Sequence, residues 1–521
     1  MFDILISDGK LVDGTGAPWR YTDVGIVGGR IAAVGQLQGR EARQHIEARG
    51  QVVCPGFIDI HSHADMTLLA GRWMDGRLRQ GITTEVIGQD GLAYAPVSPH
   101  RLDEWRRYLI GLNGDFPGVT WDWVTVGDLL RQYANKASNV VYLIPHGAVR
   151  VEVMGWDARP ATQDELRAMQ DLVRQGLKQG AAGISTGLTY MPCAHATTEE
   201  MVALCEPVAQ AGGIYATHLR SYGAQLFQAI DEAIAIGRRS GAAVQISHLR
   251  VADLALWGTA PRMLERLDQA RAGGVDVTFD IYPYTVGCAP LFCLLPPRVQ
   301  AGGPDAILAR LRDLDTQQRM SDEMKSWKID WSVYVLSNAP HNTLGDWEGY
   351  AVTSAAQAMS MDTTQFIVAL LRETELNATI VAAGGNETDN EALFRHPASM
   401  LCSDGVLVGG QPHPRGYGAY PRTLAQYVRG THSLRLEEAI HKMAGAPANR
   451  LNLQDRGVLR AGAAADVVIL SPDTVADGAT FRDGRRPPVG IDEVLVNGQV
   501  VVHHGEYIGS THGVVLTPLQ H

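Results

Sequence analysis

Between residues 54 and 454, short apolar runs of strand length alternate with longer segments in which apolar residues recur at helical spacing. In residues 162–177, for example, Leu166, Met169, Val173 and Leu177 fall on one side of a helix. Strands alternating with helices favour a parallel sheet, so we expect an α/β fold. Candidate strands lie near 55–61, 84–88, 140–145, 182–186, 213–218, 243–248, 275–281, 378–383 and 399–403. A (β/α)8 barrel has eight places, so one of these nine strands is expected to lie elsewhere.

Both ends of the chain have a different pattern, with alternating apolar positions and hairpin turns but no clear helix. Phe2, Ile4 and Ile6 alternate with other residues, Gly28-Gly29 indicates a hairpin, and Asn497-Gly498 suits a type I′ turn. We therefore predict one small β-domain made from residues 1–53 and 455–521, flanking a catalytic unit of residues 54–454.

A long stretch within the predicted barrel interrupts the alternation of strands and helices. Residues 288–375 are rich in charge and contain the segment Leu294-Leu-Pro-Pro-Arg298. A connection of this length is usually functional, so we predict an insertion that acts as a lid or specificity element.

Composition narrows the class of partner. The chain has 521 residues and a net charge of −11, which argues against nucleic acid or an anionic membrane as a partner. Its N-terminus is a short alternating strand without a secretory signal, so the cytoplasm is the expected location. The six cysteines follow no paired framework, as expected for reduced thiols in that compartment: Cys54, Cys193, Cys205, Cys288, Cys293 and Cys402.

Polar residues with metal-binding chemistry follow several of the candidate strands. His61 and His63 stand one residue apart at the end of the first strand, where alternate side chains share a face. The other strand ends carry Asp90, His218, His248 and Asp404. A (β/α)8 barrel brings such residues to one face, so we predict that these six side chains surround a common divalent metal site. A single strand histidine is more often structural, but six ligand-type groups at successive strand ends favour a site.

Taken in order along the chain, the motifs resemble those of the N-acyl-D-amino-acid deacylases, or D-aminoacylases, of the amidohydrolase superfamily. The resemblance covers nearly the whole chain and is carried by Pro55-Gly-Phe-Ile-Asp-Ile-His-Ser-His, Gly81-Ile-Thr-Thr-Glu-Val-Ile-Gly, Gly183-Ile-Ser-Thr-Gly-Leu-Thr-Tyr, Thr217-His-Leu-Arg, Gln245-Ile-Ser-His, Tyr282-Pro-Tyr-Thr, Ser403-Asp-Gly and His413-Pro-Arg-Gly-Tyr-Gly. It implies a distorted TIM barrel with a small β-sandwich domain and an insertion late in the barrel. It also implies hydrolysis of N-acyl-D-amino acids to a carboxylate and a free amino acid.

The chemistry of the predicted site suits that reaction. A divalent ion lowers the pKa of a bound water toward ~7 and polarises an amide carbonyl. Asp404 is the expected general base, which takes a proton from water and returns it to the leaving nitrogen. The best-known members of the family carry a zinc-binding cysteine where this chain has Asp90. Zinc is the expected metal, as one or two ions, but an oxygen ligand widens the choice to manganese or cobalt.

A second set of residues is expected to bind the substrate. Arg250 is the leading candidate for the carboxylate, because arginine binds carboxylates bidentately, although relatives often have lysine there and a structural salt bridge is an alternative. Tyr190, Tyr282 and Arg415 are carried over from the family as pocket residues, with core packing an alternative for the tyrosines. His146 ends the third strand and is expected to line the pocket. A serine that relatives present near residues 286–290 is replaced here by Val-Gly-Cys-Ala-Pro.

Two other classes of function remain open. One is a cyclic amidase, hydantoinase- or dihydroorotase-like, or a deaminase on the same metal barrel. The other is a barrel without catalysis that serves in assembly or interaction, which a complete ligand set disfavours. The preferred amino acid, the acyl group and the oligomeric state do not follow from residue spacing.

Overall fold

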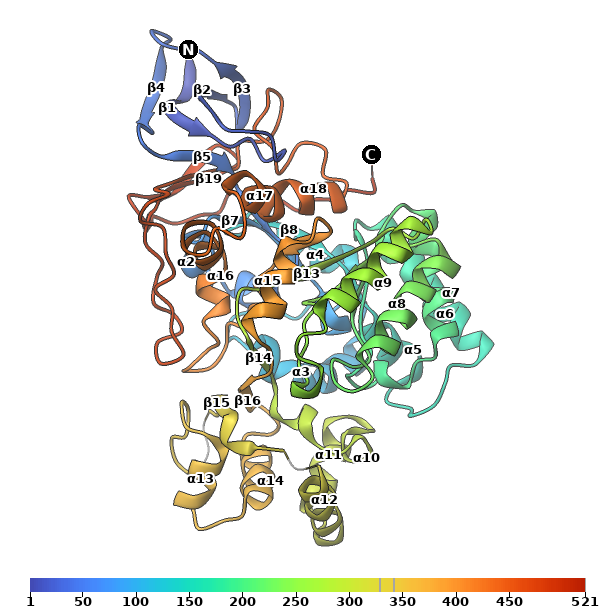
Figure 1. The fold of residues 1–521 in the computed structure, drawn as a ribbon. Helices are drawn as coiled ribbons and strands as arrows, with labels where there is room; N and C mark the ends of the chain where they lie inside the picture. Colours follow the sequence, from blue (N-terminus) through green and yellow to red (C-terminus); the bar gives the residue numbers. More distant parts are fainter. Residues whose placement is uncertain (328, 341–342, 521) are drawn as a thin grey trace.

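The computed structural model describes residues 1–327, 329–340 and 343–520. Figure 1 shows three regions along its long axis. A sheet made from both ends of the chain lies at the top of that view, parallel strands with surrounding helices fill the middle, and the segment of residues 286–383 extends to the bottom.

The middle region is built from parallel strands that close on themselves. Only Leu143 separates β8 from β9, so the sheet β6-β7-β8 continues there into the sheet β9-β10-β11-β12-β13-β17. At the other edge, Ser62 and Gly405 form a parallel bridge. The strands are β6 (Phe57–Asp59), β7 (Ile82–Ile87), β8 (Asn139–Tyr142), β9 (Ile144–Pro145), β10 (Gly183–Gly187), β11 (Ile214–His218), β12 (Ala243–Ile246), β13 (Val277–Ile281) and β17 (Ser399–Leu401).

Amphipathic helices connect the strands and lie outside them. In α6, the Thr162 hydroxyl accepts from the backbone N–H of Glu165, the Glu165 carboxylate accepts from that of Thr162, and Met169, Val173 and Leu177 are buried, which confirms the predicted helix. The connecting helices are α3 (Pro99–Asn113), α4 (Val126–Gln132), α5 (His146–Met154), α6 (Gln163–Lys178), α7 (Thr198–Gln210), α8 (Leu226–Ser240), α9 (Ala260–Ala272) and α15 (Glu387–Arg395). Shorter helices are α1 (Asp65–Ala70), α2 (Asp75–Leu78), α16 (Arg415–Thr423), α17 (Leu436–Ile440) and α18 (Ala446–Arg450).

The surplus strand of the sequence analysis is residues 378–383. It forms β16 (Thr379–Ala383), which pairs antiparallel with β14 (Val286–Pro290) and β15 (Tyr334–Asn338) in a separate sheet. A buried apolar run has the same pattern in either sheet, so the sequence does not identify its partners. Helices α10 (Pro297–Gln300), α11 (Gly303–Arg312), α12 (Leu314–Ser326), α13 (Val352–Ala358) and α14 (Thr363–Glu373) complete this segment.

Strands from both ends of the chain share one nine-stranded sheet. Its two parts meet where β5 pairs with β18, with Val53 opposite Ile469. Asn497 and Gly498 both have positive φ, 50° and 77°, as the predicted turn between β19 and β20 requires. The strands are β1 (Phe2–Leu11), β2 (Arg20–Val27), β3 (Arg30–Gly35), β4 (Ala42–Glu47), β5 (Val52–Pro55), β18 (Val467–Leu470), β19 (Ile491–Val496), β20 (Gln499–His503) and β21 (Glu506–Tyr507).

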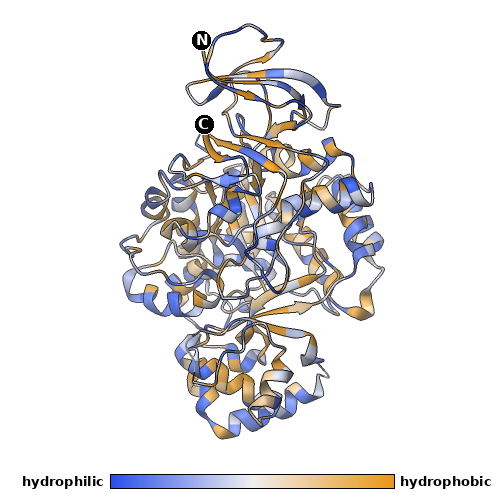
Figure 2. Cartoon of the chain, turned by 90° about the vertical axis from the view of Figure 1, so that its left-hand side faces the viewer, coloured by the Kyte–Doolittle hydropathy of each residue, from blue (hydrophilic) through white to orange (hydrophobic). Residues whose placement is uncertain are grey.

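The main apolar core runs through the middle region, into the segment at the bottom and up to the terminal sheet, where it includes Val468 and Val494. The alternate residues Val467 and Leu495 of that sheet belong to a second, separate core. Figure 2 shows the hydrophobic residues gathered on the strands and the hydrophilic residues on the outer sides of the helices. Among the described residues, no helix has both the length and the apolar character needed to cross a bilayer.

Candidate metal centre

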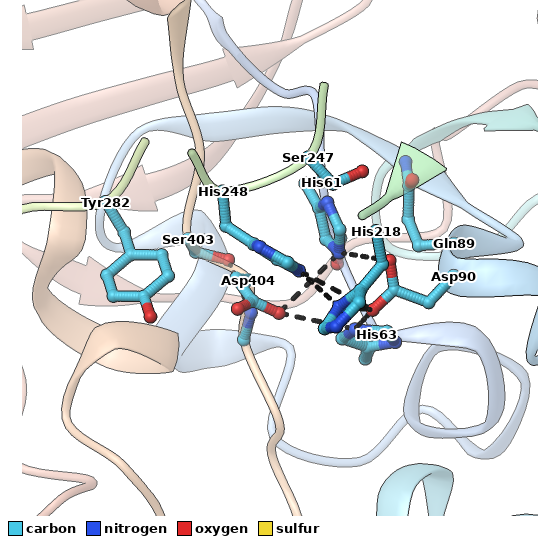
Figure 3. Close-up of polar contacts among 12 residues, drawn as sticks. His61, His63, Gln89, Asp90, His218, Ser247, His248, Tyr282, Ser403 and Asp404 are labelled. Carbon is cyan, nitrogen blue, oxygen red and sulfur yellow. Dashed lines mark hydrogen bonds and ion pairs between the residues drawn. The ribbon is translucent and has the colours of Figure 1, made fainter. Parts of the chain in front are cut away.

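The six predicted ligands lie together at one mouth of the parallel strands (Figure 3). His61 and His63 follow β6, Asp90 follows β7, His218 ends β11, and His248 and Asp404 follow β12 and β17. Carboxyl ends of parallel strands point the same way, so residues far apart in sequence meet there. We refer to these six side chains as the His/Asp cluster: His61, His63, Asp90, His218, His248 and Asp404.

Three members of the cluster adopt a strained backbone conformation. The φ angles of Asp90, His248 and Asp404 are 57°, 33° and 48°, in the left-handed region that residues other than glycine seldom adopt. Such conformations concentrate at functional sites, where the surrounding structure enforces them. Gly88, which precedes the Asp90 loop at φ 81°, has no room for a side chain, because a Cβ there would lie 2.2 Å from the Leu143 carbonyl oxygen.

Asp90 lies between the histidines of both sides of the cluster. Its Oδ1 is 3.6 Å from His61 Nε2, and its Oδ2 is 3.6 Å from His63 Nε2. The same Oδ2 is 3.7 Å from His218 Nδ1 and 3.8 Å from His248 Nε2. Asp90 therefore belongs to two possible ligand triads, one with His61 and His63 and the other with His218 and His248.

Asp404 faces the cluster from the opposite side. Its Oδ1 is 3.3 Å from His63 Nε2 and 3.6 Å from His61 Nε2, while its Oδ2 is 2.7 Å from Arg415 Nη1. Burial alone would raise the pKa of Asp404, but the Arg415 guanidinium and the imidazole of His248 hold it well below its usual value. Asp404 is therefore an ionised carboxylate.

The charges and pKa values of the cluster favour a bound cation. Burial lowers the pKa of His218 to about 4, so its ring is neutral, the form that binds metal. Burial also disfavours protonation of His63, but Asp404 and Asp90 outweigh it and raise the pKa of His63 to about 10. The two carboxylates thus favour a positive charge beside the ring of His63. Either a proton on the ring or a bound divalent ion supplies that charge.

Unpaired polar atoms support the same conclusion. Both ring nitrogens of His61, His63 Nδ1 and Asp90 Oδ1 are buried without a hydrogen-bond partner among the described residues. Buried polar atoms are normally paired, so this concentration of unpaired nitrogen and oxygen atoms fits residues that bind a metal ion. Imidazole nitrogens with carboxylate oxygens form a donor set that fits zinc, manganese or cobalt.

Asp280 is a neighbour of the cluster that the sequence analysis missed. Its Oδ1 accepts from the His248 backbone N–H at 2.6 Å and lies 3.7 Å from His61 Nδ1. A carboxylate behind a histidine ligand fixes the orientation of the ring. Asp280 lies inside β13, and an aspartate between the apolar residues Phe279 and Ile281 was the available signal.

A buried ionic network, also missed, supports the Asp404 loop from behind. Arg77 of α2 donates to both carboxylate oxygens of Glu85, at 2.9 and 2.8 Å, and also pairs with Asp59. It further donates to the Ser403 hydroxyl at 2.9 Å, while the Ser403 backbone N–H donates to Asp59 at 2.9 Å. Because Ser403 precedes Asp404, the network fixes where that carboxylate points.

A cavity of about 270 Å³ opens onto the cluster, and four of the five predicted substrate-binding residues line it: Tyr190, Arg250, Tyr282 and Arg415. The prediction for His146 is not met. Its ring is fully buried beside α7, bonded to the Thr186 hydroxyl at 2.9 Å and to Glu200 at 3.0 Å, and lies outside the lining. The position of a residue at a strand end does not determine which way its ring turns.

Two of these residues are in direct contact. Arg250 Nη1 donates to the Tyr282 hydroxyl at 2.5 Å, and the Arg415 guanidinium lies over the Tyr282 ring, 4.5 Å from its centroid. On the other side, the Tyr190 hydroxyl is 3.4 Å from His218 Nδ1. Strand β14, where relatives were expected to present a serine, lines the cavity with Cys288, Ala289 and Pro290 instead.

Known proteins resemble this chain over almost its full length. The sequence model of the amidohydrolase family matches residues 44–294 and 388–502, ranges that include the whole His/Asp cluster. An N-acyl-D-glutamate deacylase of Alcaligenes xylosoxydans xylosoxydans is 35% identical over 96% of this chain and 93% of its own. A D-aminoacylase of the same organism is 33% identical over 99% of this chain and 97% of its own.

A solved structure gives the corresponding likeness in three dimensions. It is the N-acyl-D-glutamate deacylase from Bordetella bronchiseptica, complexed with zinc and a phosphonate inhibitor that mimics the tetrahedral intermediate of the reaction. It matches this chain with a TM-score of 0.84 at 32% identity, covering 99% of each chain.

Proposed function

Because the chain belongs to the amidohydrolase family, we propose that it is a metal-dependent hydrolase of N-acyl-D-amino acids, which yields a carboxylate and a free D-amino acid. The membership expected from the sequence motifs is thereby confirmed. The observation that carries the proposal is the convergence of four histidines and two aspartates at the mouth of a cavity that also holds two arginines.

The His/Asp cluster is the proposed site of the divalent metal. Asp90 with His61 and His63 would form one ligand triad, and Asp90 with His218 and His248 would form another, so these side chains would hold one or two ions. Zinc is the first choice, and the oxygen ligand at position 90 makes manganese and cobalt competent alternatives. When bound, the metal activates water and polarises the scissile carbonyl.

The roles of the chain's own residues follow from their contacts. Asp404 accepts the proton of the attacking water and delivers it to the departing nitrogen, since its carboxylate is ionised and faces the cluster. Arg415 holds that carboxylate in place through its 2.7 Å contact. Arg250 binds the carboxylate of the amino acid, and the hydroxyls of Tyr190 and Tyr282 orient the substrate between it and the metal.

We also propose a role for each region of the molecule. We interpret the closed parallel strands as a distorted (β/α)8 barrel of residues 54–454. The terminal sheet is then the small β-sandwich domain of residues 1–53 and 455–521, and residues 288–375 form the insertion that shapes the cavity. The cytoplasm is the proposed location, consistent with six cysteines that form no disulfide.

A screen combined with metal analysis tests the proposal. The purified protein, loaded with zinc, manganese or cobalt, is assayed on N-acetyl-D-amino acids, N-acetyl-L-amino acids, hydantoins and adenine. We expect turnover of the N-acetyl-D-amino acids and at least one equivalent of bound metal. Preferential turnover of hydantoins or adenine would replace the proposal with a cyclic amidase or a deaminase, and inactivity on every compound would leave a non-catalytic role.

A further inference from the structure

The cavity contains one arginine that is not neutralised by the protein. Arg250 and Arg415 are the arginines of its lining within the described part of the chain. Arg415 has Asp404 as its counter-ion at 2.7 Å. Arg250 makes no ion pair with any described residue, and its guanidinium donates to the neutral hydroxyl of Tyr282. The cavity therefore offers one unpaired positive charge outside the metal centre.

Two glycines place this charge at a defined end of the cavity. A Cβ on Gly287 of β14 would lie 2.5 Å from Arg250 Nη1, and a Cβ on Gly384, just after β16, would lie 2.8 Å from Nη2. The guanidinium therefore rests directly against the backbone of the small antiparallel sheet. A side chain at either position would push it away.

The opposite end of the same sheet is apolar. Ala289 pairs with Ile380, two residues along from the pair of Gly287 and Ala382, and alternate residues of a strand share a face. At about 3.4 Å per residue, the Ala289–Ile380 pair lies roughly 7 Å along the sheet from the Gly287–Ala382 pair beside the guanidinium. Pro290, Leu112 of α3 and Leu294 are further apolar residues of the cavity lining. We call Ala289, Pro290, Ile380, Leu112 and Leu294 the apolar wall.

From this arrangement we infer the substrate class: N-acyl-D-amino acids with apolar side chains, such as those of methionine or leucine, and not those with acidic side chains. The inference rests on the proposed function. The single α-carboxylate of such a substrate satisfies Arg250, and the side chain fills the apolar wall. A second carboxylate, as in glutamate, would be buried against the apolar wall without a counter-ion. Burying an unpaired charge has a large cost in free energy, so such a substrate should react poorly.

A comparison of two substrates of similar length isolates the effect of the charge. The metal-loaded, full-length enzyme is assayed on N-acetyl-D-methionine, N-acetyl-D-glutamate and N-acetylglycine, which lacks a side chain. We expect kcat/KM for the methionine substrate to exceed that for glutamate by at least about 10²-fold. Glutamate turnover within tenfold of methionine turnover, or above it, would overturn the inferred class while leaving the proposed function intact. Inactivity on all three substrates would instead contradict the proposed function.

Two neighbouring residues of β16 test the location of the side chain. Ile380 belongs to the apolar wall, whereas the side chain of Val381 points to the other face of the sheet, toward Val335 and Ser337. Ile380→Ala should lower kcat/KM for N-acetyl-D-methionine about tenfold, mainly through KM, and leave N-acetylglycine unaffected. Val381→Ala should change neither. An equal loss on both substrates in Ile380→Ala would overturn the placement. If that variant does not fold, the comparison of substrates with the unaltered enzyme still decides the inference.

Discussion

Two buried aspartates share the centre of the site, yet their neighbours give them different chemistry. Asp90 has imidazole nitrogens near both carboxylate oxygens, so both oxygens face histidines of the cluster. Asp404 directs one oxygen toward His63 and the other to Arg415. One oxygen of Asp404 is thus held by a fixed guanidinium while the other faces the cluster, an arrangement suited to moving a proton.

The assignment of Asp404 is tested by removing its charge while keeping its shape. Asp404→Asn cannot accept the proton of water, so turnover should fall by at least about 10²-fold while the metal content stays unchanged. Kinetics with metal analysis by mass spectrometry measure both. Asp231→Asn, at an exposed aspartate paired with Arg266, is the control and should retain full activity. Near-normal turnover in Asp404→Asn would remove the residue from the proton transfer.

At the scale of elements, strand ends position the ligands and α2 supports them from behind. The strand pattern predicted where His61, His218 and His248 meet, because barrel strands deliver their carboxyl ends to one face. It did not predict Arg77, whose partners come from two strands and a distant loop. It also misplaced His146, and it did not identify which of the nine candidate strands lies outside the barrel. Contacts between elements depend on side-chain direction and partner choice, which local patterns do not contain.

The Arg77 network should contribute strongly to stability. Arg77→Ala leaves Asp59 and Glu85 buried without their cation, so we expect the free energy of unfolding to fall by about 3–5 kcal/mol. Urea unfolding of the two proteins measures this loss. Arg79→Ala is the matched control, because its partner Glu506 is 74% exposed, and the change there should stay below about 1 kcal/mol. Equal losses in both variants would contradict a special role for the network.

The Asp90 loop depends on a glycine that no other residue can replace. At Gly88, alanine would combine positive φ with a clash against the Leu143 carbonyl, so Gly88→Ala should displace the loop and weaken metal binding at least about tenfold. Gly71 has φ 64° but open space around a Cβ. Gly71→Ala should therefore lower the free energy of unfolding only by the cost of the backbone conformation, about 1–2 kcal/mol. Competition with a fluorescent chelator measures metal affinity. Unchanged affinity in Gly88→Ala would contradict the steric argument.

At the scale of the whole molecule, the His/Asp cluster joins segments from residue 61 to residue 404. The strands that carry it close through contacts between the segments after β6 and β17, where the Asp404 backbone N–H donates to the His61 carbonyl at 2.9 Å. The ligands therefore span the seam of the closed strands as well as their mouth. A bound ion adds a cross-link at this seam, so the metal should stabilise the fold as well as serve the reaction.

Metal removal tests that coupling. The chelator-treated protein should be inactive and should melt at a lower temperature than the loaded protein, since an ion at 100 times its Kd stabilises by about 2.7 kcal/mol. Zinc, manganese or cobalt should restore both properties, whereas magnesium, which prefers oxygen ligands, should not.

A second group of potential ligands, Glu493, His503 and His504, lies on the terminal sheet with its imidazoles exposed. The chelation and the addition of metal are therefore repeated with the double variant His503→Ala/His504→Ala. This variant should recover activity and melting temperature as the unaltered protein does. Full activity in the metal-free protein would exclude the metal from the reaction, and a melting temperature that is independent of metal would show that the seam closes without it.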